Sequence, residues 1–136
     1  HATENDAALA ARYVGTIRRW FPRLRIFARA GGRVADVARA AGLSVWEEAF
    51  LDRGYRPDGT LIPRGDPGAL LGDPAAIRVR IRDVRSGRGL LTESGERFPM
   101  APRTWCVHSD TPDSLRLARI GAEELAREGG RMREEG

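Results

Sequence analysis

The chain has 136 residues, of which 41% are hydrophobic and 31% are charged, and its formal net charge is +4 at pH 7. This length allows one domain of ordinary size, and the hydrophobic content suffices for a core, which excludes a disordered chain. No apolar run is long enough to cross a bilayer and the first residues form no signal pattern, so no membrane partner is expected. The single Cys106 excludes an internal disulfide and favours a cytoplasmic, reducing compartment.

The basic residues are all arginines, 23 in number, and 19 acidic residues are interspersed among them. Because arginine does not titrate in the ordinary range, it raises the isoelectric point to about 10.4 without building a basic patch. The densest cluster, "RVRIRDVR" at 78–85, is predicted to spread its arginines around a solvated helix face. No nucleic-acid partner is therefore expected.

An amphipathic helix is predicted over residues 3–21, and Pro22 ends it. Its apolar stripe consists of Leu9, Tyr13, Val14, Ile17, Trp20 and Phe21. A strand over 24–27, a helix over 33–42 and a strand over 44–50 follow.

A loop rich in Gly, Pro and Asp spans residues 52–72 and precedes a helix over 73–87. Thr111 is predicted to cap a final helix, and Pro112 to occupy its first turn. Residues 129–136 are expected to form a frayed tail. Between the last two helices lie a hairpin over 88–100 that turns at Ser94-Gly95 and a strand over 104–108.

The alternation of helices and strands predicts an α/β fold with parallel strands joined by helical crossovers. Ligands of such folds bind at the carboxyl ends of the strands. His108 and Asp110 follow one strand, and Asp52 and Arg53 follow another. We therefore expect these side chains to form an active site, in which a carboxylate beside His108 fixes its tautomer for acid–base catalysis.

Two alternatives apply to the His108–Asp110 pair. The H-x-D spacing also supplies two metal ligands, but two ligands do not make a site, so the metal status stays open. Asp110 also has the chemistry of a helix cap.

The 52–72 loop is longer than most structureless connections, and loops of this length are usually functional or disordered. Pro57-Asp58-Gly59 is a strong turn signal within it. Arg53 or Arg64 is suited to bind a substrate carboxylate through paired hydrogen bonds. Alternatively, Asp52, Arg53 and Asp58 only hold the loop together through ion pairs.

The stretches "EEAFLDRGYRPDGTLIPRGDPGALL" at 47–71 and "CVHSDTPDSLRLAR" at 106–119 resemble the LamB/YcsF family. The motifs of that family are similar to E-x-F-A-D-R-x-Y, D-G-x-L-x-P-R, P-G-A and C-V-H-G-D-T-P. The matching positions are Glu48, Phe50, Asp52, Arg53, Tyr55, Asp58, Gly59, Leu61, Pro63, Arg64, Pro67, Gly68, Ala69, Cys106, Val107, His108, Asp110, Thr111 and Pro112.

This resemblance implies a β/α barrel of the glycoside hydrolase/deacetylase type. It also implies the activity of the A subunit of an ATP-dependent 5-oxoprolinase, which with partner subunits B and C opens the lactam of 5-oxoproline to glutamate. ATP is then handled through the partner subunits. The candidate catalytic residues are His108, Asp110 and Asp52. The candidate substrate-binding residues are Glu48, Arg53, Tyr55, Asp58 and Arg64.

The chain departs from the family pattern in three respects. Ser109 stands where the family has glycine, and Leu51 where it has alanine. A closed β/α barrel usually takes about 250 residues, so residues 1–128 are expected to form the C-terminal half of a barrel domain. The family's N-terminal motifs D-x-N, G-H-A-G-D and K-P-H-G-A-L-Y are not found here. An alternative function is therefore a non-catalytic remnant or assembly module, which binds a partner chain or a second copy of itself.

Overall fold

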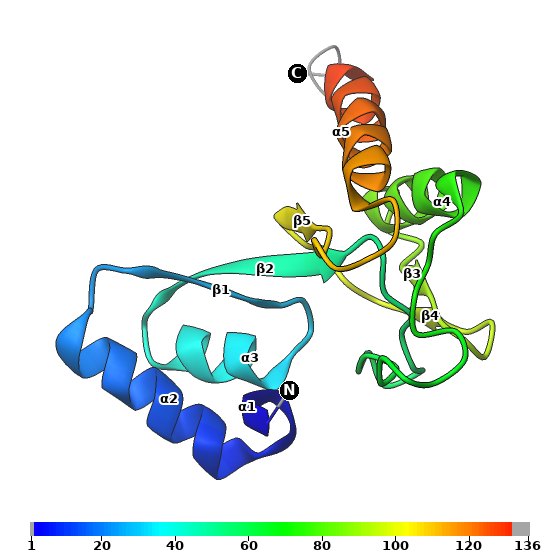
Figure 1. Cartoon of the computed structure of the whole chain (residues 1–136). Coiled ribbons are helices and arrows are strands. Elements are labelled where there is room, and N and C mark those ends of the chain that lie inside the picture. Colours follow the sequence, from blue (N-terminus) through cyan, green and yellow to red (C-terminus); the bar gives the residue numbers. More distant parts are fainter. Residues whose placement is uncertain (1, 132–136) are drawn as a thin grey trace. The chain divides into compact units, whose positions relative to one another are not determined.

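The computed structural model describes residues 2–131 and divides into two compact units. The first unit comprises the chain up to residue 49 together with residues 102–104, and the second comprises the rest. In chain order the elements are α1 (Ala2–Asn5), α2 (Ala7–Trp20), β1 (Arg25–Arg29), α3 (Arg33–Ala40), β2 (Ser44–Phe50), α4 (Pro74–Arg85), β3 (Leu90–Leu91), β4 (Arg97–Phe98), β5 (Thr104–Cys106) and α5 (Ser114–Arg131) (Figure 1).

The first unit contains a parallel strand pair joined by a helical crossover, as the alternation of elements predicts. β1 pairs with β2 from Arg25 opposite Ser44 to Arg29 opposite Glu48, and α3 connects the two strands. Helix α3 packs against β1, and α2 lies alongside α3 (Figure 1). Small side chains allow this close packing. The buried core of the unit consists of Ala10, Val14, Ile26, Ala28, Val34, Ala35, Ala38 and Leu43.

The helix predicted over 3–21 is interrupted at Asp6. The Asp6 carboxylate accepts hydrogen bonds from the backbone N–H groups of Ala8 (2.8 Å) and Leu9 (3.1 Å), and Asp6 is thereby the N-cap of α2. The expected apolar stripe is only partly buried. Val14 is in the core, whereas Trp20 is 65% exposed.

The second unit is built on helices α4 and α5, which pack against each other (Figure 1). Asp73 caps α4 by accepting the N–H of Ala75 at 3.0 Å, as predicted. β3 and β4 form the predicted antiparallel hairpin. The buried apolar side chains of this unit are Leu51, Tyr55, Ile77, Ile81, Val84, Leu90, Leu117 and Ile120.

β5 is shorter than the strand predicted over 104–108 and lies beside β2 in the sheet order β1-β2-β5. The α/β fold with parallel strand pairing is thus confirmed. Within the described residues, no helix has the length and apolar character needed to span a membrane.

The final helix begins at Ser114, so the predictions that Thr111 caps it and that Pro112 lies in its first turn are wrong. The physical reason is that the Thr111 hydroxyl donates to Asp52, and the chain turns at Asp113 with a φ of 56° before the helix starts. α5 extends to Arg131 and includes residues 129–131 of the predicted tail, whereas residues 132–136 lie outside the described residues.

The 52–72 loop folds back on itself by backbone pairing. Gly54 donates its N–H to the carbonyl of Ala69 (2.9 Å) and accepts from the N–H of Ile62 (3.1 Å). A Cβ at Gly54 would lie 2.0 Å from the carbonyl oxygen of Gly68. Only glycine therefore allows the two sides of this loop to approach so closely.

Gly54→Ala is expected to lower the free energy of unfolding by about 1–3 kcal/mol, because the added methyl group overlaps backbone atoms that cannot move aside. The matched control is Gly72→Ala, whose methyl group would meet no atom within 4 Å. Urea unfolding followed by tryptophan fluorescence measures both variants. Equal stability of the two variants would contradict the close approach.

Candidate active site

The candidate site is centred on Asp52, whose side chain is fully buried in the second unit. Its backbone is held on both sides. The N–H of Leu51 donates to the carbonyl of Cys106, and the N–H of Leu71 donates to the carbonyl of Asp52, both at 2.9 Å. The loop and the segment after β5 therefore meet at this carboxylate.

Three donors from the segment after β5 satisfy the Asp52 carboxylate. The backbone N–H of His108 donates to Oδ2 at 3.0 Å, and the Thr111 hydroxyl donates to the same oxygen. The Nδ1 atom of His108 lies 3.0 Å from Oδ1 and 3.2 Å from Oδ2. A buried carboxylate without such partners would be strongly destabilising.

This geometry decides the tautomer of His108. An ionised carboxylate only accepts hydrogen bonds, so Nδ1 carries the proton and donates it to Asp52. The neutral ring then presents Nε2 as its basic nitrogen. The His108 side chain is 26% exposed, and its ring centroid lies 5.0 Å from that of Phe50, so the ring is not sealed among aliphatic side chains. His108 can accept and return a proton at Nε2.

Asp52 remains ionised in this environment. Burial raises the pKa of its carboxyl group, but the hydrogen bonds from the Thr111 hydroxyl and from the ring and backbone of His108 outweigh burial. The net effect is a pKa below the ordinary value. A charged carboxylate at this distance is suited to stabilise a protonated imidazole.

The sequence predicts that a carboxylate beside His108 fixes the tautomer of its ring. Asp110, two residues further along the chain, does not fill this role. It forms a two-pronged ion pair with Arg64, with Nη1–Oδ2 at 2.9 Å and Nη2–Oδ1 at 3.0 Å. Both side chains are exposed, at 39% for Arg64 and 65% for Asp110. The carboxylate beside the imidazole is Asp52, 56 residues away in the chain.

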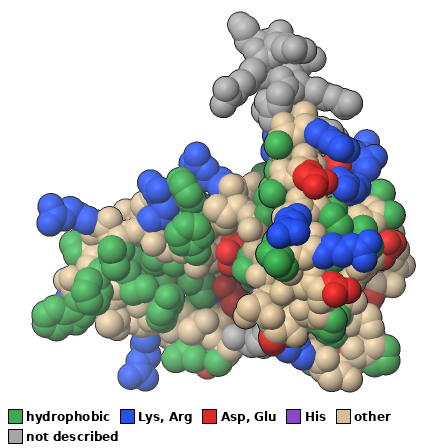
Figure 2. Space-filling model, turned by 45° about the horizontal axis from the view of Figure 1, so that its top comes forward, with side chains coloured by type: hydrophobic (Ala, Val, Ile, Leu, Met, Phe, Trp, Pro, Cys, Tyr) green, Lys and Arg blue, Asp and Glu red, His purple; other side chains and the backbone are tan. Residues whose placement is uncertain are grey.

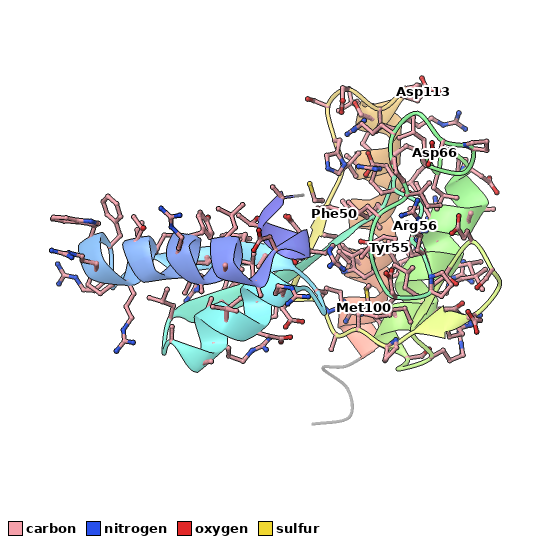
Figure 3. All side chains as sticks on the ribbon, turned by 90° about the horizontal axis from the view of Figure 1, so that it is seen from below. Phe50, Tyr55, Arg56, Asp66, Met100 and Asp113 are labelled. Carbon is pink, nitrogen blue, oxygen red and sulfur yellow. The ribbon has the colours of Figure 1, made fainter. Side chains whose placement is uncertain are left out.

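Arg53 and Tyr55 lie inside the loop. The Arg53 guanidinium donates to the carbonyls of Ala69 (3.1 Å) and Ile62 (2.7 Å), and the Tyr55 hydroxyl accepts the N–H of Phe50 at 2.9 Å. Both side chains are at most 2% exposed. This placement favours the loop-holding alternative for Arg53, with hydrogen bonds to carbonyls in place of the expected ion pairs. Tyr55 lies close to Phe50 in the same unit (Figure 3).

The other two predicted substrate-binding residues lie elsewhere. Asp58 accepts from the N–H (2.9 Å) and the hydroxyl (2.6 Å) of Thr60 and so shapes the predicted turn. Glu48 is half-buried on β2 and belongs to the first unit.

Within residues 2–131, no group of three or more His, Cys, Asp or Glu side chains is arranged to hold a metal ion.

Sequence reasoning misses two residues around Asp52. It assigns Thr111 to the helix cap and Arg80 to a solvated face, whereas Arg80 is only 8% exposed. The signal for Arg80 is present in the helical spacing, because the buried Ile77, Ile81 and Val84 lie on the same face of α4.

The model of the LamB/YcsF family matches residues 1–135 of the sequence. The chain belongs to the LamB/YcsF family. This LamB/YcsF chain is 37% identical over 128 residues to a protein named as the A subunit of 5-oxoprolinase, from Streptomyces avermitilis, a match that covers 94% of the chain and 51% of that protein. It is also similar to the crystal structure of a lactam utilization protein from Thermus thermophilus, with a TM-score of 0.75 and 30% identity, over 91% of the chain and 49% of that protein. The chain thus spans about half the length of these relatives.

Thr111→Val is expected to raise the pKa of Asp52, because it removes one of the hydrogen bonds that hold this pKa low. A carboxyl group whose pKa is lower in the folded than in the unfolded state stabilises the fold at every pH above its unfolded-state pKa of about 3.9. This stabilisation is lost as the pH falls through the folded-state pKa. At pH 7 the variant should lose about 1–3 kcal/mol of unfolding free energy, and the difference from wild type should narrow in acid.

The carboxyl carbon shift of Asp52 in an NMR titration measures this pKa directly. The control is Thr16→Val, which removes a hydroxyl that donates to the carbonyl of Arg12 in the first unit. An unchanged titration of Asp52 in Thr111→Val would refute the role of this hydroxyl.

Proposed function

We propose that the chain carries the proton-transfer centre of a lactam-opening hydrolase and acts as the A subunit of an ATP-dependent 5-oxoprolinase. The observation that carries the proposal is the buried Asp52 beside the partly exposed His108. One relative is named for 5-oxoprolinase and the other for lactam utilization, and both names support the choice of a lactam as substrate class.

The chemistry of lactam opening needs such a centre. Water adds to the carbonyl carbon of the five-membered amide, the C–N bond breaks, and the nitrogen leaves as an amine that needs a proton. In the proposed reaction His108 takes the proton of the attacking water at Nε2 and returns it to the leaving nitrogen. Asp52 holds the ring in the required tautomer and stabilises its charged form.

Arg64 is the proposed site for the free carboxylate of 5-oxoproline. Its guanidinium already binds the Asp110 carboxylate through two contacts, one from each Nη atom to a separate oxygen, as arginine commonly binds carboxylates. Both groups are exposed, so a substrate carboxylate can replace Asp110. Exposed ion pairs of this kind contribute little stability, about 0–1 kcal/mol, and the exchange is correspondingly inexpensive.

The remaining parts of the proposal follow from the family. Subunits B and C would supply the handling of ATP. The parallel strands described here would form part of a β/α barrel that the rest of the family fold completes. A cytoplasmic setting, expected from the single thiol, belongs to the same proposal.

His108→Ala is expected to reduce ATP-dependent glutamate release from 5-oxoproline by about 10²–10⁴-fold in kcat, because it removes the proposed proton acceptor Nε2. The assay combines the chain with subunits B and C and with the half of the family fold that it does not span. His108→Gln retains a hydrogen-bond donor for Asp52 and separates loss of chemistry from loss of structure. Ser114→Ala, at a half-buried position of the same segment, is the control and should remain near the wild-type rate. Undiminished glutamate release by both His108 variants would remove the catalytic assignment.

Arg64→Gln is expected to raise KM for 5-oxoproline by about 10- to 100-fold with little change in kcat, because it removes a charged pair of hydrogen bonds to the substrate. The reaction with 2-pyrrolidone, a lactam without the carboxylate, should be unaffected. Arg56→Gln is the matched control, since Arg56 is an exposed arginine of the same loop and pairs with Asp66 at 3.8 Å. An equal loss for both lactams would contradict carboxylate binding by Arg64.

A second candidate function is the assembly module, which the exposed apolar side chains of the first unit favour. Hydrophobic side chains gather over this unit in Figure 2, and such patches often mark interfaces. In this case the chain would be needed for glutamate release, yet the His108 variants would retain full activity. The exposed large apolar side chains of the first unit are Leu9, Tyr13, Trp20, Phe21, Leu24 and Phe27.

A further inference from the structure

Arg80 is a buried cation whose partners are backbone carbonyls rather than carboxylates. It lies on the core-facing side of α4 and is 8% exposed. Its Nη1 atom donates to the carbonyl oxygens of Phe50 (2.9 Å), Leu51 (3.1 Å) and Arg53 (2.6 Å). Within residues 2–131 no carboxylate forms an ion pair with it. Burying a guanidinium that forms no direct ion pair is costly, so these three contacts need a specific explanation.

The three carbonyls bracket Asp52 in the chain. Two precede it and one follows it, so the peptide groups on both sides of Asp52 are tied to the same nitrogen. The Tyr55 hydroxyl accepts the N–H of Phe50, and the Tyr55 ring centroid lies 5.5 Å from the Arg80 guanidinium carbon. Arg80 thus holds carbonyl groups of the segment 50–53, and Tyr55 holds an N–H group of the same segment.

We infer that Arg80 is a positioning residue, which holds the backbone around Asp52 so that both carboxylate oxygens face His108 and Thr111. The inference rests on the proposed function insofar as His108 is the proton carrier. Rotation of the peptide groups beside Asp52 would turn its carboxylate away from Nδ1 of the ring, and catalysis is sensitive to such small displacements.

Arginine suits this role because its planar group offers several donors in a rigid arrangement and resists loss of its charge. Burial lowers the pKa of Arg80 to about 10, which leaves the group charged at neutral pH. Arg80 also lines a cavity of about 350 Å³ together with Gly54, Tyr55 and Leu71. A shorter side chain at this position would leave the three carbonyls to mobile water, which satisfies them without fixing their direction.

The test compares Arg80→Met and Arg80→Lys with Arg78→Met. Arg78 lies on the same helix and pairs with Glu123 and Glu124 of α5, both at 3.2 Å, so its loss weakens the packing of the unit without touching Asp52. For each variant the measurements are the free energy of unfolding, the carboxyl titration of Asp52 by NMR, and kcat and KM for glutamate release.

The pKa of Asp52 reports the position of its carboxylate, because this pKa is low only while the donors of Thr111 and His108 are aligned with it. The titratable and charged groups that face Asp52 are His108 after β5, Arg53 on its own loop and Arg80 on α4. Lysine keeps the charge but not the planar group, so Arg80→Lys separates the charge of Arg80 from its geometry.

The expected result is a titration midpoint of Asp52 that rises from wild type to Arg80→Lys and further to Arg80→Met, with kcat reduced by about 10²-fold in Arg80→Met and KM little changed. Arg78→Met should lose stability with the midpoint unmoved. If the Asp52 midpoint in Arg80→Lys equals that of wild type, only the charge of Arg80 matters and the inference is overturned. A shift in Arg78→Met as large as in Arg80→Met would also overturn it.

The two proposals fail separately. The titration needs no substrate, so a shifted midpoint in a protein that releases no glutamate would overturn the proposed function and leave the positioning role intact. Glutamate release that is the same in wild type and Arg80→Met would overturn the positioning role alone.

Discussion

The structure of the second unit depends on how one buried carboxylate is satisfied. Asp52 has no exposed surface and receives its hydrogen bonds from the backbone and ring of His108 and from the hydroxyl of Thr111. An ionised group in this position is stable only while all of these donors are in place. The same contacts join the 52–72 loop to the segment between β5 and α5, and they select the tautomer of the imidazole. Structural and chemical requirements therefore coincide at this residue.

Two buried arginines extend this arrangement into the loop and the helix. Arg53 donates to carbonyls within the loop, and Arg80 donates to carbonyls around Asp52. A guanidinium group can serve several carbonyls at once, which the single ammonium group of a lysine does less well. The chain has no lysine, and its arginines differ in their partners: the buried Arg53 and Arg80 bind carbonyls, whereas the exposed Arg64 binds a carboxylate. Arg64, at 39% exposure, is the arginine at which we propose that a substrate carboxylate replaces Asp110.

Much of the fold was predictable because it depends on local patterns. The β2 strand over 44–50, the cap of α4 at Asp73 and the hairpin that turns at 94–95 follow from alternation, capping chemistry and turn residues. The errors arose where a side chain has two possible partners. Thr111 bonds to Asp52 instead of capping α5. Local propensity cannot rank a nearby backbone donor against a partner 59 residues away.

The sequence by itself determined the α/β class, the family and the two segments that meet at the candidate site, because motifs and periodicity are properties of neighbouring residues. Only the tertiary structure decided that Asp52, and not Asp110, lies beside His108, and that Arg53 and Tyr55 are buried while Arg64 is exposed. Which carboxylate meets an imidazole depends on how distant segments pack, and burial depends on what covers a side chain. Neither quantity is encoded in the spacing of residues along the chain.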